Sequence, residues 1–221
     1  MPAGTVAFLR RGVYGFRRRS TMVYRIKGKK ILFPQGFAEG SVFIENGGIK
    51  AVNADIPFDA EYDAGENFVL PGLIDIHTHG ALNYDFADAD VNGIVSAVKY
   101  HLSHGATSVM PTITSSTCEK TFAALSELEK AMKDEKYGGC ILGAHLEGPY
   151  FSEKQSGAQD KSLITPPVKA DYERITERFG GIIKRSSPCS FLKSLDIGRA
   201  NIPSLIFMRG IIRENQPSLL R

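Results

Sequence analysis

The segment PGLIDIHTHG, from Pro71 to Gly80, decides the fold because it joins an apolar run to two closely spaced histidines. The apolar residues around its start predict a strand buried on both faces, as in a parallel sheet; they are Val69, Leu70, Leu73, Ile74 and Ile76. Residues two apart on a strand point to the same side, so we expect His77 and His79 to project together. The segment therefore predicts two imidazoles facing one metal ion, although histidines that only hydrogen-bond within a core would fit the same spacing.

The residues after this strand predict a helix, a strand and a second helix. Apolar residues recur at helical spacing between Val91 and Leu102, and residues 106–112 then show the pattern of a strand. Ser116 and Glu119 form a capping box, which is expected to begin the second helix.

Residues 140–147 predict a third strand, on which His145 and Glu147 share a face. Strands that alternate with helices favour right-handed βαβ units in a parallel sheet or barrel. Catalytic groups of such barrels lie at the carboxyl ends of the strands, so we expect Glu147 near His77 and His79. A solvated loop carboxylate is the alternative for Glu147.

The region before Pro71 has a different pattern, with short apolar runs separated by turn residues. Asn46-Gly47-Gly48 between two such runs indicates a hairpin, and we expect residues 22–70 to form a small antiparallel sheet. Residues 1–21 hold five arginines and no acidic residue. We expect a disordered basic extension there, with an organellar targeting segment as the alternative.

Composition excludes several classes of protein. The formal charge is +3, but the five arginines of residues 1–21 leave −2 on the remainder, so no nucleic-acid footprint is indicated. Three scattered cysteines fit a reducing compartment and a cytoplasmic location rather than a disulfide framework. No run approaches the roughly 18 apolar residues of a membrane helix, so no membrane partner is expected.

Two motifs together resemble a known family. The Pro71–Gly80 segment is similar to the first barrel strand of the amidohydrolase superfamily, and GAHLEGPYFSEKQSGAQD, residues 143–160, narrows the resemblance to N-acetylglucosamine-6-phosphate deacetylases. The resemblance implies that Glu147 binds the main metal ion and that His77 and His79 build or support a second site. It also places Ala158 and Gln159 at the substrate, through backbone and side-chain hydrogen bonds, with His145 as an orienting neighbour.

The resemblance also implies the fold class, an α/β protein with a partial (β/α)8 metal-dependent hydrolase barrel preceded by the small antiparallel sheet. Residues 71–185 correspond to the N-terminal half of that barrel, ending in a predicted helix at 169–179 and a fourth strand at 182–185. A whole barrel takes roughly 250 residues. Residues 186–221 form a divergent tail without histidine. A truncated or frame-shifted gene is our expectation, and a short paralogue is the alternative.

The implied reaction is deacetylation of N-acetylglucosamine 6-phosphate to glucosamine 6-phosphate and acetate, with a divalent metal ion, zinc by expectation. The family's catalytic aspartate and later histidines have no counterpart here, so no catalytic residue is assigned, and the chain's own activity is in doubt. The resemblance suggests a homodimer for the intact enzyme. The alternatives are a non-catalytic fragment that partners an intact subunit, or another amidohydrolase of the dihydroorotase or allantoinase type.

Overall fold

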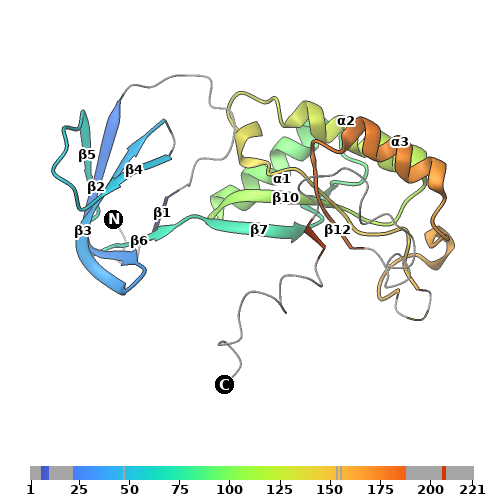
Figure 1. Cartoon of the computed structure of the whole chain (residues 1–221), viewed down its shortest axis with the longest axis horizontal. Coiled ribbons are helices and arrows are strands. Elements are labelled where there is room, and N and C mark those ends of the chain that lie inside the picture. The colour runs from blue at the N-terminus through green and yellow to red at the C-terminus, as the bar shows by residue number, and fades with distance from the viewer. Residues whose placement is uncertain are drawn as a thin grey trace. The chain divides into compact units, whose positions relative to one another are not determined.

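The computed structural model describes residues 6–9, 22–46, 48–152, 154, 156–187 and 206–207 (Figure 1). The chain divides into two compact units. One comprises Met1–Ile74 with His101–Ser108, and the other comprises Asp75–Tyr100 with Val109–Arg221.

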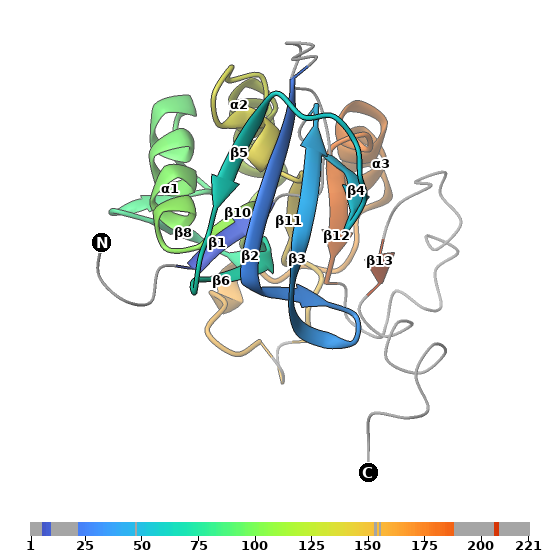
Figure 2. The same cartoon turned by 90° about the vertical axis from the view of Figure 1, so that its left-hand side faces the viewer.

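A six-stranded sheet forms most of the first unit, and it is mixed rather than purely antiparallel. Its strands are β1 (Val6–Leu9), β2 (Val23–Phe33), β3 (Gly36–Glu45), β4 (Gly48–Val52), β5 (Ala60–Asp63) and β6 (Phe68–Pro71). The β2–β3 and β3–β4 pairs are antiparallel, as expected, and β5, β2, β3 and β4 lie side by side (Figure 2). However, β5 and β6 both pair with β2 in parallel: β5 lies along Tyr24–Lys27, and β6 continues in the same direction along Lys30 and Ile31.

Strand β1 lies within the segment that was expected to be disordered. It pairs in parallel with β6, in a register that places Val6 opposite Phe68 and Leu9 opposite Pro71. The physical reason for the difference is that an edge strand such as β6 offers unpaired backbone groups, and any extended segment can satisfy them. The other residues expected to form the extension lie outside the described part of the chain.

A second sheet has the strand order β13-β12-β11-β10-β7. Its members are β7 (Leu73–Thr78), β10 (Ala106–Ile113), β11 (Ala144–Leu146), β12 (Ile183–Ser186) and β13 (Ile206–Phe207). The pairings from β10 to β13 are all parallel. A short hairpin of β8 (Gly80–Ala81) and β9 (Tyr84–Asp85) follows β7.

Three helices lie on one face of this parallel sheet (Figure 1). They are α1 (Val91–Ser103), α2 (Cys118–Ala131) and α3 (Lys169–Phe179). Ile94 and Val98 are fully buried on α1, and Leu125 and Leu128 are almost fully buried on α2, which confirms the predicted helical faces. In the described part of the chain, no helix is both long and apolar enough to cross a membrane.

The prediction that β7 is buried on both faces is wrong. The exposed fractions are 55% for Leu73, 60% for Ile74 and 49% for Ile76, whereas Val69 in β6 is fully buried. Strand β7 is the last strand in the sheet order and pairs only with β10 among the described strands. An apolar strand that closes one end of an open sheet keeps much of its side-chain surface in solvent.

Two further boundaries differ from the predictions. Thr117, not Ser116, caps α2, because the Thr117 side chain accepts a hydrogen bond from the Lys120 backbone N–H. The third strand is shorter than 140–147, since Gly138–Cys140 forms a 3₁₀ turn and Gly143 adopts a φ of +131°, which interrupts the extended chain. Another 3₁₀ turn, Lys161–Leu163, precedes α3. The predicted tail contributes the last residue of β12, Ser186, then Ser187 and β13, and its remaining residues lie outside the described chain.

The glycine between β6 and β7, Gly72, is required by packing, which leads to a first prediction. A Cβ at Gly72 would collide with the side chain of Thr107, whose hydroxyl donates to the Leu73 carbonyl. We expect Gly72→Ala to destabilise the protein by about 1–3 kcal/mol, because overpacking displaces the strand. Urea unfolding measures the change, and Gly181→Ala is the matched control, since that Cβ would meet open space.

Urea unfolding of Gly72→Ala in a Thr107→Gly background shows whether the loss of stability comes from the collision or from the reduced backbone freedom of alanine. The double variant should lose less stability than the sum of its two single changes, because the colliding atoms are gone. Strict additivity of Gly72→Ala and Thr107→Gly would contradict the packing explanation.

A second prediction concerns the ion pair between α2 and α3. Arg178 donates to both carboxylate oxygens of Glu129, at 3.1 and 2.7 Å, and this interaction lowers the pKa of Glu129. A lowered carboxyl pKa contributes stability above the unfolded value of about 4.3 and loses it as the pH falls. We therefore expect Arg178→Gln to lower the Tm slightly at pH 7 and low salt, with the difference disappearing near pH 3.

The control for this prediction is Lys130→Gln, because Lys130 pairs with Glu127 on the same helix. That variant should change the Tm less than Arg178→Gln does. A Tm difference for Arg178→Gln that persists undiminished at pH 3 would show that the ion pair is not its origin.

Candidate metal centre

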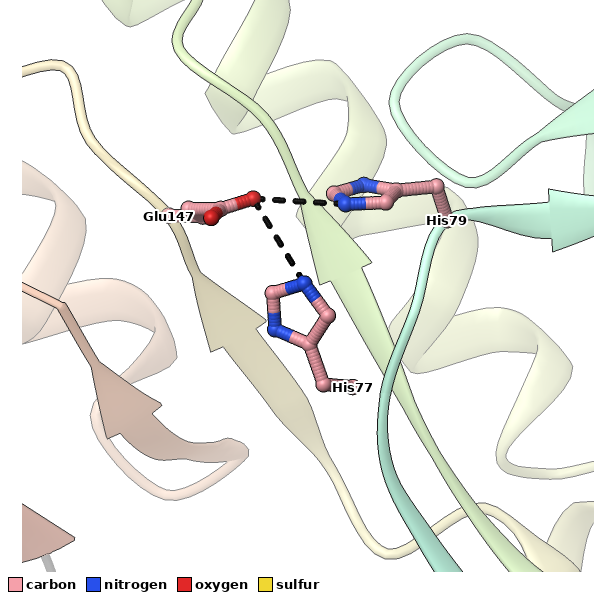
Figure 3. A group of neighbouring side chains, drawn as sticks. All are labelled: His77, His79 and Glu147. Carbon is pink, nitrogen blue, oxygen red and sulfur yellow. Dashed lines mark ion pairs between the residues drawn. The ribbon is translucent and has the colours of Figure 1, made fainter. Parts of the chain in front are cut away.

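Three potential metal ligands converge at the ends of two strands. His77 lies in β7 and His79 directly after it, while Glu147 directly follows β11. Figure 3 shows the two imidazoles and the carboxylate pointing toward one another. His79 Nε2 lies 3.3 Å from Glu147 Oε2, and His77 Nε2 lies 3.9 Å from the same oxygen.

The donor set fits a divalent metal ion. One donor atom from each residue can be chosen so that all three lie within 4.8 Å of one another. An ion about 2.0–2.2 Å from each nitrogen or oxygen donor requires a slightly tighter cluster, which small side-chain rotations provide. Two neutral imidazoles and one carboxylate form a donor set typical of zinc enzymes, in which open positions accept water or substrate. Their side chains are 41%, 39% and 22% exposed, so solvent reaches the cluster.

The backbone next to Glu147 is held by the neighbouring strand. The Glu147 N–H donates to the Ile113 carbonyl at the end of β10, at 2.8 Å. Gly148 then turns the chain with a φ of +97°, and a Cβ there would collide with Ser115. A side chain at position 148 is therefore excluded twice, by conformation and by space. This packing fixes the backbone position of Glu147, from which its carboxylate side chain extends.

His145 is a buried, uncharged residue that packs next to the cluster. It is fully buried, its Nδ1 is 3.1 Å from the Thr112 hydroxyl, and its Nε2 is 2.8 Å from the Ser187 hydroxyl. Burial, helped by the nearby charge of Arg185, lowers the pKa of His145 to about 3. Both ring nitrogens are engaged with hydroxyl groups, so His145 supports the His77 ring, whose centroid is 5.1 Å away, rather than offering a lone pair to an ion.

Arg185 is a site neighbour that the sequence reasoning missed. Its residue surface is 6% exposed, and its guanidinium donates to the Ile76 carbonyl at 2.9 Å. The hydrogen bond holds the peptide that precedes His77, and it joins β12 to β7 across the two strands between them. In β12, Ile183 and Arg185 are both buried while Lys184 and Ser186 are half-buried, so the alternation of a strand places Arg185 on the same face as Ile183.

Two buried nitrogen atoms near the cluster lack hydrogen-bond partners among the described residues. They are Nδ1 of His79 and Nε of Arg185. The second ring nitrogen of a metal-binding histidine normally donates to an oxygen atom, so His79 lacks that support in the described part of the chain.

The two predicted substrate residues lie on the loop after β11. Ala158 is exposed, and Gln159 is half-buried. The Gln159 side-chain oxygen accepts a hydrogen bond from the Ser115 backbone N–H at 3.1 Å, so the loop is tied to the end of β10. Asp160 begins the following 3₁₀ turn by accepting from the backbone and hydroxyl of Ser162, which lower its pKa.

Known proteins resemble this chain over part of their length. The N-acetylglucosamine-6-phosphate deacetylase of Vibrio furnissii is 37% identical over 119 residues, covering 52% of this chain and 29% of that protein. The deacetylase of the same name from Bacillus subtilis is 32% identical over 152 residues, covering 66% and 38%. The chain thus spans only about a third of each relative.

Solved structures show the same fold. The crystal structure of N-acetylglucosamine-6-phosphate deacetylase from Pasteurella multocida superimposes with a TM-score of 0.67 at 21% identity, covering 75% of this chain and 44% of that one. This likeness confirms the expected fold class, a partial α/β barrel preceded by a small sheet. The model of the Amidohydrolase family matches residues 68–196, which include all three potential ligands. The chain is therefore a member of the amidohydrolase family, a family of metal-dependent hydrolases.

Proposed function

We propose that this chain carries the first half of the active site of an N-acetylglucosamine-6-phosphate deacetylase, which yields glucosamine 6-phosphate and acetate. The observation that carries the proposal is the convergence of Glu147 with His77 and His79 within 4.8 Å, in a family member whose curated relatives bear that name. The proposal divides the chain into a small sheet domain at 22–70, a half-barrel at 71–185 and a tail at 186–221.

Each site residue has a role in this proposal. Glu147 holds a divalent ion, zinc by preference, and His77 and His79 complete or extend its coordination. When bound, such an ion polarises the acetamide carbonyl and lowers the pKa of a bound water. Ala158 and Gln159 bind the N-acetyl sugar through a backbone and a side-chain hydrogen bond. The uncharged His145 packs against His77 and keeps the cluster in place.

Proton transfer is the part of the reaction for which this chain offers no assigned residue. The family resemblance places the catalytic aspartate and two later histidines in regions that have no counterpart here. A non-catalytic fragment that acts with an intact subunit is the second candidate. A homodimer and a cytoplasmic location are further proposals from the resemblance.

The metal proposal predicts a selective loss of affinity. We expect Glu147→Gln, His77→Asn and His79→Asn each to weaken Co²⁺ or Zn²⁺ binding by about 10- to 100-fold or more, because each removes a ligand atom. Calorimetry measures the affinity, and visible Co²⁺ absorption reports the coordination. His104→Asn is the control, since His104 does not belong to the cluster. Unchanged affinity in all three cluster variants would refute the site.

The activity proposal predicts little turnover by the chain alone. Loss of a proton-transfer group costs about 100- to 10,000-fold in rate, so acetate release from N-acetylglucosamine 6-phosphate with added zinc should fall far below that of a whole deacetylase. The Glu147→Gln variant sets the background. Robust turnover that Glu147→Gln abolishes would establish an active enzyme and exclude the fragment.

A further inference from the structure

Ser115 occupies the junction between the metal ligand and the substrate loop. It lies two residues after β10, and its surface is 5% exposed. Its backbone N–H donates to the Gln159 side-chain oxygen at 3.1 Å, and its hydroxyl lies 3.5 Å from the Glu147 carbonyl. One buried residue therefore contacts both functional parts of the site.

The contact with Gln159 fixes the orientation of that side-chain amide. A backbone N–H can only donate, so the atom facing Ser115 must be the amide oxygen and not the amide nitrogen. The –NH₂ group of Gln159 then remains for other partners, with two N–H donors. Gln159 is half-buried, so part of its surface remains in solvent.

The contact with Glu147 restricts movement on the other side. Gly148 packs so closely on Ser115 that any Cβ there would collide with the serine side chain. A shift of Ser115 therefore displaces the chain that directly follows Glu147, and it also displaces the anchor of Gln159. The two parts of the site are mechanically linked through one residue.

We propose that Ser115 is a positioning residue that couples Gln159 to Glu147, and that Gln159 consequently acts only as a hydrogen-bond donor to an acceptor oxygen of the ligand. This inference deepens the proposed function and rests on it for the identity of the ligand. The acceptor belongs to the sugar phosphate, as an acetamide carbonyl, a hydroxyl or a phosphoryl oxygen.

The anchoring step is tested by amide hydrogen exchange, which needs neither ligand nor turnover. In Gln159→Glu, a carboxylate oxygen can still accept from the Ser115 N–H, whereas Gln159→Leu offers no acceptor. We expect protection of the Ser115 amide to fall about 5-fold in Gln159→Leu, as expected for a hydrogen bond worth about 1 kcal/mol, and to persist in Gln159→Glu. Equal protection in the wild type and both variants would overturn the inference.

The donor role is tested by binding of three probes, measured by calorimetry. Both variants should bind N-acetylglucosamine 6-phosphate several-fold more weakly, about 3- to 10-fold for one lost hydrogen bond. N-acetylglucosamine lacks the phosphate, and glucosamine 6-phosphate lacks the acetyl group. The probe whose affinity the variants do not change identifies the group that Gln159 contacts. Undiminished binding of every probe by Gln159→Glu would contradict the donor role.

The link to Glu147 is tested through metal affinity. Ser115→Ala keeps the backbone N–H but removes the hydroxyl, so Co²⁺ affinity should fall about 10-fold, as it does when residues that orient a ligand are removed. Ser116→Ala is the control and should not change it. If the hydrogen-exchange result holds but no sugar phosphate binds, the proposed function fails and the positioning role of Ser115 stands. Unchanged Co²⁺ affinity in Ser115→Ala would refute the link between Ser115 and Glu147.

Discussion

The parallel register between β10 and β11 is the constraint on which the site depends. Thr112 pairs with His145 and Ile113 with Leu146, so the chain leaves β11 at the point where Glu147 faces the two histidines of β7. Side chains alternate along a strand, and a slip of one residue would turn Glu147 to the opposite face of the sheet. The hydrogen bond from Glu147 to Ile113 continues the same register into the loop.

Polar contacts stabilise this arrangement where an apolar interior alone would not define it. His145 lies between the hydroxyl groups of Thr112 and Ser187, and Arg185 reaches from β12 to the backbone of β7. Buried hydrogen bonds of this kind specify one geometry, because leaving either partner unpaired costs about 1–3 kcal/mol. They hold the ligand-bearing strands in register although β7 exposes much of its apolar surface.

The same features bring the three potential metal ligands together within the described part of the chain. The three ligands come from β7 and the end of β11, which both lie in the half-barrel, and they need no further strand to meet. Their side chains are partly exposed, so the cluster is accessible to solvent.

The sequence by itself determined the elements that local patterns encode. The 3.6-residue period from Val91 to Leu102 became α1, and the helix at 169–179 has the predicted bounds. The spacing of His77 and His79 predicted that their imidazoles project together, and the family resemblance added Glu147 to the predicted metal ligands. Only the tertiary structure decided the rest, because exposure of β7 depends on which strands pair beside it, and the contacts of Arg185 with Ile76 and of Ser115 with Gln159 join residues far apart in the chain.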